Sequence, residues 1–223
     1  WSSDVCSSDL QNIAGDEGQN VLVYLGVKPG GNYVDEVTQE KTGTNILHVA
    51  SDEPPGKLEE IKSKLFEQRE KRVRPLLDDK ILTDWNGLMI AALSKAARAF
   101  QVSEYAEEAV RSADFILGTM WDGEELLHRY REGEAQIGGF LNDYAFTTWG
   151  LIEIYQATQE KRFLDAAIRV NEVMMSQFAD SEGGFYFTSS EAEELLARRK
   201  ELYDGAIPSG NSVAFMNLVR LSR

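Results

Sequence analysis

The feature that most constrains the fold is a pattern of helical segments that repeats after 58 residues. The stretch from Leu93 to Ala109 aligns with the stretch from Leu151 to Ala167, and each copy reads as an apolar helix, a short break and an amphipathic helix. A further copy begins near Ser209. Repeats of about 50 residues with two helices each are typical of helical arrays and of closed rings of helix hairpins. The pattern therefore predicts an all-α domain.

The two helices of each copy differ in how much of their surface is apolar. Residues 85–100 and 144–155 are apolar or small on nearly every side, which is typical of a helix that is buried all round. Residues 103–120 and 163–178 carry one apolar stripe each, and residues 213–223 form a further apolar-periodic segment. Because buried helices alternate with one-faced helices, we expect an inner and an outer ring.

Segments of strand character connect the copies and also precede them. Residues 126–131 and 183–188 occupy corresponding places in the two links, and we expect short β-hairpins there. Nearer the start, residues 45–49 read as a strand, and residues 57–74 read as a charged helix that Pro75 ends. Long connections inside a compact helical domain are more often functional than accidental.

Composition and charge exclude several classes of function. The net charge of −14 argues against binding to nucleic acids or anionic membranes, because such surfaces need clustered lysine and arginine. The sequence has no run of about 20 apolar residues, so we expect no membrane span. The one cysteine, Cys6, can form neither a disulfide within the chain nor a cysteine metal site, which favours a cytoplasmic location.

The first ten residues resemble translated sequencing-adapter sequence and begin without methionine. We expect residues 1–10 to be foreign to the native protein and residues 11–223 to form one partial domain. The last apolar-periodic segment stops at Arg223 without a C-cap signal, so the chain reads as an internal piece of a longer protein. An unclosed ring exposes apolar faces, which predicts poor solubility of the chain alone.

Three aspartates lie at or just before the starts of the apolar helices: Asp84, Asp143 and Asp204. Stacked hairpins would gather them at one end, where crowding would push their pKa values apart and supply a general acid and a general base. The alternative is that these polar residues only cap the helices and complement the helix dipole. That alternative applies most directly to Asp84 and Asn142. Asn142 and Ser209 already offer caps beside Asp143 and Asp204, which leaves those two carboxylates open to either use.

Neighbouring side chains would complete such a site. Trp85 and Tyr144 could stack on a sugar ring, although aromatic residues at such positions more often pack in the core. His128 and Arg129 alternate on a strand and so point to opposite faces, and histidine is the natural proton carrier near neutral pH, although a surface or core role is the more common one. The turn before Ser212 is either an anion site formed by free backbone N–H groups or an ordinary helix start. The candidate ligand-binding residues are Trp85, Asn86, His128, Arg129, Tyr144, Ser209 and Asn211.

Other catalytic and metal motifs are missing from the sequence. It contains no nucleophilic serine elbow, no His-Glu-x-x-His motif and no metal-spaced set of cysteines and histidines. We therefore expect neither a metal site nor a cofactor.

Three segments, in order along the chain, resemble one known family: Leu77–Ile90, Gly139–Ala145 and Asp204–Ser212. Over residues 15–223 the chain is similar to the thioredoxin-domain-containing family, also known as DUF255, that includes spermatogenesis-associated protein 20. The resemblance implies about half of an (α/α)6 six-hairpin glycosidase-like toroid, with a thioredoxin-like domain of the same protein as its partner. The redox motif of the family belongs to that other domain, so no redox function transfers to this chain.

The resemblance also implies a class of function. The wider superfamily holds sugar epimerases, glycoside hydrolases and unsaturated-uronide hydrolases, which implies a carbohydrate-active domain with a sugar-like ligand. Sugar epimerases of this fold use histidines, and this chain offers only His48 and His128. The alternative is a non-catalytic ligand-binding or docking module that serves the thioredoxin-like domain. Aspartate carboxyls about 5 to 10 Å apart beside a cleft would favour the enzyme, and carboxylates bound to backbone caps around a filled centre would favour the module.

Overall fold

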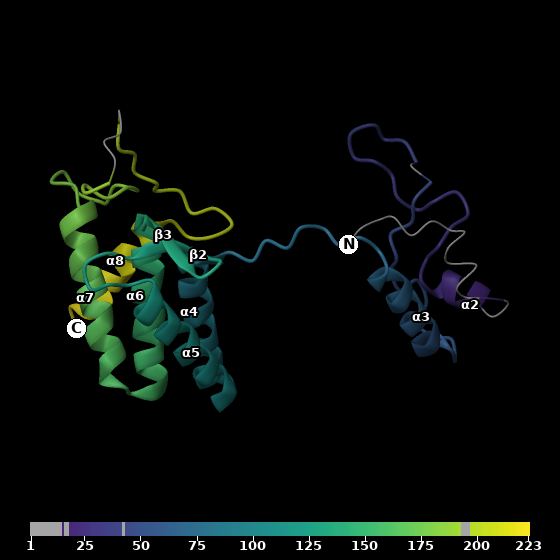
Figure 1. The fold of residues 1–223 in the computed structure, drawn as a ribbon, viewed down its shortest axis with the longest axis horizontal. Coiled ribbons are helices and arrows are strands. Elements are labelled where there is room, and N and C mark those ends of the chain that lie inside the picture. Colours follow the sequence, from purple (N-terminus) through teal and green to yellow (C-terminus); the bar gives the residue numbers. More distant parts are fainter. Residues whose placement is uncertain (1–14, 16–17, 42, 193–196) are drawn as a thin grey trace. The chain divides into compact units, whose positions relative to one another are not determined.

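The computed structural model describes residue 15 and residues 18–41, 43–192 and 197–223 (Figure 1). It divides the chain into two compact units, one that ends at Leu77 and one that begins at Asp78, and each is described by itself. The predicted foreign leader lies outside the described residues. One domain over residues 11–223 stays a prediction, and both full copies of the repeat lie in the second unit.

In the part of the first unit that the structure describes, two helices stand beside a loop that asparagine side chains hold in place. Helix α2 spans Gly18–Tyr24, and α3, which confirms the predicted charged helix, spans Leu58–Glu70. The predicted strand at residues 45–49 is wrong, because the segment forms no β-ladder: asparagine side chains and a backbone hydrogen bond from the His48 N–H to the Leu25 carbonyl (3.2 Å) hold it. The Asn45 side chain accepts a hydrogen bond from the Lys28 N–H (2.9 Å) and donates one to the Lys28 carbonyl (3.1 Å). The buried core of this unit is made of Val21, Leu58 and Ile61.

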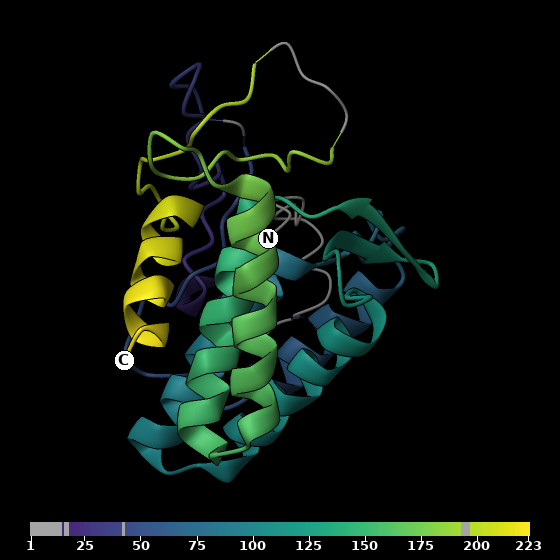
Figure 2. The same ribbon diagram turned by 90° about the vertical axis from the view of Figure 1, so that its left-hand side faces the viewer.

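The second unit combines paired helices with a small antiparallel sheet (Figures 1 and 2). Its helices are α4 (Thr83–Phe100), α5 (Ser103–Thr119), α6 (Leu141–Thr158), α7 (Lys161–Phe178) and α8 (Gly210–Leu221). Its strands are β1 (Ile81–Leu82), β2 (Leu127–Arg131) and β3 (Glu134–Gly138), which pair in the order β1–β2–β3. Helices α4 and α6 start at residues 83 and 141 and helices α5 and α7 at 103 and 161, so both pairs are 58 residues apart. The predicted repeat is confirmed.

Helices α4 and α6 also end in the same way. Each is followed by a glutamine in the left-handed conformation, Gln101 with φ 56° and Gln159 with φ 60°. A left-handed residue is a common way to end a helix and reverse the chain. The two hairpins, α4–α5 and α6–α7, therefore share the left-handed residue that ends their first helix, and their helices are nearly equal in length, with 18 and 17 residues in one hairpin and 18 and 18 in the other.

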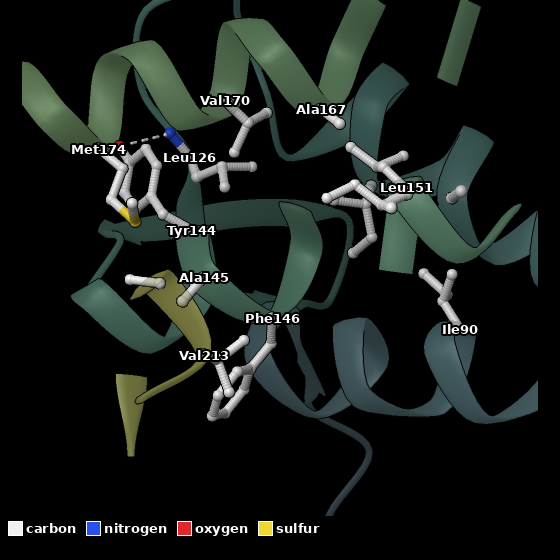
Figure 3. Close-up of a cluster of buried hydrophobic side chains, with 14 of the residues drawn as sticks. Ile90, Leu126, Tyr144, Ala145, Phe146, Leu151, Ala167, Val170, Met174 and Val213 are labelled. Atoms are coloured by element: carbon white, nitrogen blue, oxygen red, sulfur yellow. Dashed lines mark hydrogen bonds between the residues drawn. The ribbon is translucent and has the colours of Figure 1, made fainter. Parts of the chain in front are cut away.

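Helix α6 is the centre of the second unit. It packs against α4, α5, α7 and α8, and Figure 2 shows α7 and α8 beside it. Side chains of α6 are buried on almost every side, whereas α5 and α7 bury one stripe each, which confirms the predicted inner and outer helices (Figure 3). Helix α4 is less buried than predicted, because the described residues place neighbours on only part of its surface, and Trp85, Met89 and Phe100 are exposed. None of the described helices combines the length and apolar character needed to cross a membrane.

Two glycines allow α4 and α6 to approach closely. A Cβ atom on Gly87 would lie 2.6 Å from the backbone carbon of Phe146, and one on Gly150 would lie 2.9 Å from the Cγ2 atom of Ile90. Both distances are too short for a real Cβ atom, so Gly87 lies against the backbone of α6, and Gly150 makes room for the Ile90 side chain of α4. This contact sets how closely the starts of the two helices approach.

The two links between helices have different structures. The predicted strand at residues 126–131 is confirmed as β2, which forms a hairpin with β3. The corresponding strand at residues 183–188 is wrong, because only an isolated bridge joins Ala179 and Phe185. Here the Asn211 side chain binds both the N–H and the carbonyl of Phe185 (2.8 and 2.9 Å), so a side chain takes the place of a partner strand.

Candidate functional site

The starts of α4, α6 and α8 lie together at one end of the second unit. The backbone N–H of Asp84 in α4 donates a hydrogen bond to the Asp143 carboxylate in α6 (2.9 Å). Gly210 at the start of α8 lies so close to α6 that a Cβ atom there would clash with Asn142. Stacking of the repeats therefore gathers the polar clusters as the sequence predicts.

The Asp143 carboxylate is fully buried and fully engaged. Its Oδ1 atom accepts the N–H of Asp84, and its Oδ2 atom accepts the N–H of Phe140 (2.7 Å). The Nδ1 atom of His128 lies 3.0 Å from both oxygens. Asp143 thus holds the start of its own helix, the start of α4 and one histidine ring at the same time.

The three-stranded sheet brings His128 to this carboxylate. Strand β1 leads directly into α4 and pairs with β2, where Leu82 lies opposite Arg129. The Thr83 hydroxyl donates to the Leu127 carbonyl (2.5 Å) and fastens β2 against the helix start. His128, between Leu127 and Arg129, is thereby placed on the first turns of α4 and α6.

The contact with Asp143 determines the protonation of His128. A carboxylate only accepts hydrogen bonds, so the Nδ1 atom of His128 carries the proton, and the Nε2 atom of the neutral ring holds the free lone pair. The hydrogen bond to Asp143, with the negative charges of Asp143 and Asp84, raises the pKa of His128, against the opposing effect of burial. The His128 side chain keeps 22% of its surface exposed, so the ring is still reachable.

Asp84 adds a second carboxyl group to the site. Its Oδ1 atom accepts the N–H of Trp85 (2.7 Å), and one potential ligand atom each of Asp84, His128 and Asp143 lies within 4.8 Å of the others. Burial first, and then the charge of Asp143, raise the pKa of Asp84. Two nearby carboxyls in different environments are the usual arrangement for separate acid and base roles.

Aromatic rings surround part of the site. The Phe140 ring meets the His128 ring edge-on, with centroids 5.1 Å apart, and the Phe187 ring stacks on Phe140 at 5.0 Å. Neither phenylalanine was among the predicted site residues, because their contacts depend on how the two links fold. Trp85 has 65% of its surface exposed, so it is a surface residue next to Asp84.

Three of the predicted ligand contacts are instead used within the protein. The Asn86 amide donates to the Leu82 carbonyl (2.8 Å). Tyr144 is fully buried, and its hydroxyl accepts the Leu126 N–H (3.0 Å; Figure 3), while burial raises its pKa to about 12. Asn211 binds backbone atoms of the second link, as described above. Stacking by Tyr144, which is fully buried, and ligand binding by Asn211, whose amide oxygen and nitrogen both have partners, do not fit the structure, whereas for Asn86 only the amide nitrogen is engaged.

The capping alternative holds fully for the third inner helix and in part for the first two, where Asp84 and Asp143 lie in the first turn and accept backbone N–H groups of the helix starts. Ser209 caps α8, and its side chain accepts the Ser212 N–H (3.2 Å). The cap residues of α4 and α6 are Leu82 and Phe140, so Asp84 and Asn142 lie inside the first turn. Asp143 nevertheless performs part of a cap's role by accepting the Phe140 N–H.

The remaining candidates have other partners. The Asp204 carboxylate accepts the Ser209 N–H (2.8 Å), and this bond, with one to Ser212, lowers the pKa of Asp204. Among the described residues, the close group of acidic and histidine side chains therefore comprises Asp84, His128 and Asp143, without Asp204. Arg129 donates to Gln136 across the hairpin (2.7 Å), away from the partner of His128.

The same three side chains are the ones that could hold a metal ion. Asp84, His128 and Asp143 each offer one ligand atom, and two carboxylates with one imidazole suit a divalent cation. Binding through Nδ1 of His128 would, however, break its hydrogen bond to Asp143. The expectation of no metal stays a prediction.

Comparison with known proteins places the chain in a family. No protein-family model matches it. The chain is similar to spermatogenesis-associated protein 20 of Rattus norvegicus, with 34% identity over an alignment of 232 residues that covers 92% of this chain. Over this segment, the chain belongs to the spermatogenesis-associated protein 20 family. It spans 29% of the length of the rat relative, so it corresponds to only part of that family member.

Solved structures show what fold this segment of the family has. A cellobiose 2-epimerase from Bacillus thermoamylovorans matches with a TM-score of 0.52 and 17% identity, over 64% of this chain and 40% of the enzyme. A sugar epimerase from a ruminal bacterium matches with a TM-score of 0.53 and 16% identity, over 74% of this chain and 47% of the other. At such identities the likeness concerns the fold, and it confirms the predicted α/α toroid architecture of this segment.

Proposed function

We propose that this chain carries the acid–base site of a carbohydrate-active domain. In this site Asp84 and His128 exchange protons with a sugar, and Asp143 positions His128. The observation that carries the proposal is the meeting of Asp84, His128 and Asp143 within 4.8 Å at the joined starts of two inner helices. The sugar-epimerase fold of the two structural neighbours supports a sugar as the ligand.

The geometry supports a division of roles between the two reacting groups. Nε2 of neutral His128 is the free base, and it can take a proton from a sugar hydroxyl, a C–H beside a carbonyl, or water. Asp84, whose pKa is raised by burial and by Asp143, can deliver a proton to the departing or newly formed oxygen. The exposed Trp85 ring next to Asp84 offers a face on which a sugar could stack.

A non-catalytic docking module is the second candidate. One observation favours it: both carboxylates of the site bind backbone N–H groups, Asp143 those of Asp84 and Phe140, and Asp84 that of Trp85. In that case the exposed apolar side chains of the inner helices would bind a partner. In both cases we propose that the thioredoxin-like domain expected for this family, and the rest of the toroid, belong to the same protein.

The experiment is a screen of reducing sugars and uronides with the full-length protein. Thermal shift identifies ligands, and incubation in D₂O followed by NMR separates the reactions: deuterium at carbon indicates epimerisation, and a new reducing end indicates hydrolysis. His128→Gln should abolish turnover, whereas His48→Gln in the first unit, the matched control, should leave it unchanged. Sugar binding without turnover in the wild type would support the docking module, and unchanged turnover in His128→Gln would contradict the acid–base assignment.

A further inference from the structure

A second charged cluster joins the three inner helices away from the acid–base site. Its centre is Glu153 in α6, whose side chain is only 3% exposed. Three cations lie near its carboxylate oxygens. Helix α4 contributes Arg98 Nη2 at 2.5 Å and Lys95 Nζ at 3.7 Å, and helix α8 contributes Arg220 Nη1 at 2.8 Å. We name Glu153, Lys95, Arg98 and Arg220 the Glu153 cluster.

The Glu153 cluster contains more cations than its carboxylate requires. A buried carboxylate needs a partner, and one well-placed cation neutralises it. Here three cations share one carboxylate, and in the described part of the chain Glu153 is the only acidic group within 4.0 Å of any of them. Three positive charges less one negative charge leave a surplus of two. In a chain with a net charge of −14, acidic side chains are abundant, so this surplus is unusual.

Glu153 holds the cations in place while leaving part of each accessible. Its Oε1 atom also accepts the Trp149 indole N–H (3.1 Å), and the Lys95 ammonium lies over the Trp149 ring, 4.8 Å from its centroid. The Lys95, Arg98 and Arg220 side chains keep 50%, 40% and 23% of their surfaces exposed, and the Nη1 atom of Arg98 also donates to the Gln156 side chain (2.8 Å), so Lys95 offers the most accessible charge. The buried acid and the indole therefore preorganise charges whose outer sides can meet a ligand.

We infer that the Glu153 cluster is a binding site for an oxyanion, the phosphate or carboxylate group of a small ligand. Arginine recognises such groups through paired N–H donors, and lysine contributes a point charge. The site is separate from the acid–base site, because Asp143 and Glu153 lie ten residues apart on α6, or about 15 Å along its axis. The inference does not depend on the proposed sugar chemistry.

The test uses full-length protein titrated with phosphate and, separately, with malonate, against chloride at matched ionic strength. We expect a saturable rise in melting temperature and calorimetric binding with at least one of the two. Lys95→Met should weaken this binding by about tenfold, the equivalent of one charged hydrogen bond. Lys64→Met is the matched control, because Lys64 is equally exposed (49%) and pairs with a single glutamate. It should bind as the wild type does.

Glu153→Gln provides a second readout. If the internal carboxylate competes with the ligand, its neutralisation should tighten anion binding even where it lowers the melting temperature of the free protein. A purely structural cluster would show no saturable response to either anion, or the same response in Lys95→Met as in the wild type. Either result overturns the inference, and neither readout involves a sugar, so its failure is distinguishable from failure of the proposed function.

Discussion

The Nδ1 atom of His128 lies 3.0 Å from both carboxylate oxygens of Asp143, and the same carboxylate accepts the backbone N–H groups of Asp84 and Phe140. One buried side chain therefore joins β2, the start of α4 and the start of α6. Changes at Asp143 should affect both the stability of the helix starts and the proton chemistry of His128.

Asp143→Ala should destabilise the protein substantially. The variant leaves the N–H groups of Asp84 and Phe140 without their acceptor, and each unsatisfied buried N–H costs about 1–3 kcal/mol. The matched control is Asp165→Ala on α7, where an exposed aspartate pairs with Lys161. That control should lower the free energy of unfolding by about 0.5 kcal/mol or less. Urea unfolding measures both, and equal effects would contradict the role given to Asp143.

Asp84→Asn should stabilise the protein at neutral pH. The folded pKa of Asp84 is raised above its ordinary value of 3.8, so folding disfavours its ionised form. The protonated form of Asp84 therefore stabilises the folded state. This stabilisation is fully present below the ordinary pKa and is lost as the pH rises through the folded pKa. Asparagine keeps an oxygen that can accept the Trp85 N–H and carries no charge.

Melting curves of wild type and Asp84→Asn as a function of pH check this expectation. The variant should melt higher than the wild type at pH 7, and the difference should vanish near pH 3, where both side chains are neutral. A variant that is less stable than the wild type at pH 7 would show that the Asp84 charge is favourable in the folded state.

Gly87→Ala should push α4 and α6 apart. Its Cβ atom would lie 2.6 Å from backbone atoms of Phe146, and overpacking of this kind costs about 1–3 kcal/mol. Gly118 in α5 is the control, because a Cβ atom there meets nothing within 4 Å. Gly118→Ala should be neutral or stabilising by up to about 1 kcal/mol. Chemical denaturation compares them, and a harmless Gly87→Ala would show that the helices do not meet there.

Exposed apolar residues of the inner helices should make this chain associate when expressed alone. Met89 on α4 and Phe215 on α8 are 57% and 50% exposed. Contiguous exposed apolar surface promotes association, so sedimentation should show oligomers that grow with concentration. Changing Met89 and Phe215 to lysine should reduce this association, whereas a monodisperse, cooperatively melting wild-type chain would contradict the prediction.

The repeat made the helical part of the fold predictable. Its 58-residue spacing recurs in the starts of the helices and in the left-handed Gln101 and Gln159. Lys95 and Glu153 also stand at equivalent positions of the repeat, 58 residues apart, and carry opposite charges. Their ion pair follows from the packing of adjacent helices, so the sequence already contained a signal for it.

The details of the site were less predictable, because they depend on short connections. Strand β1 has two residues and no periodic pattern, yet its pairing with β2 is what brings His128 to Asp143. Tyr144 and Asn211 form hydrogen bonds with backbone groups of the two links, and which of these groups need a side-chain partner depends on how the links fold. The wrong strand at residues 45–49 has a similar cause, since asparagine contacts replaced ladder partners.

NMR titration of the histidine ring protons tests the central claim most directly. The chain has two histidines, so a His48→Gln variant assigns both sets of signals. We predict that His128 titrates above its ordinary pKa of 6.5 and that Asp143→Asn lowers this pKa, because the hydrogen bond to Asp143 is the main cause of the shift. A His128 pKa at or below 6.5 that Asp143→Asn leaves unchanged would contradict the account.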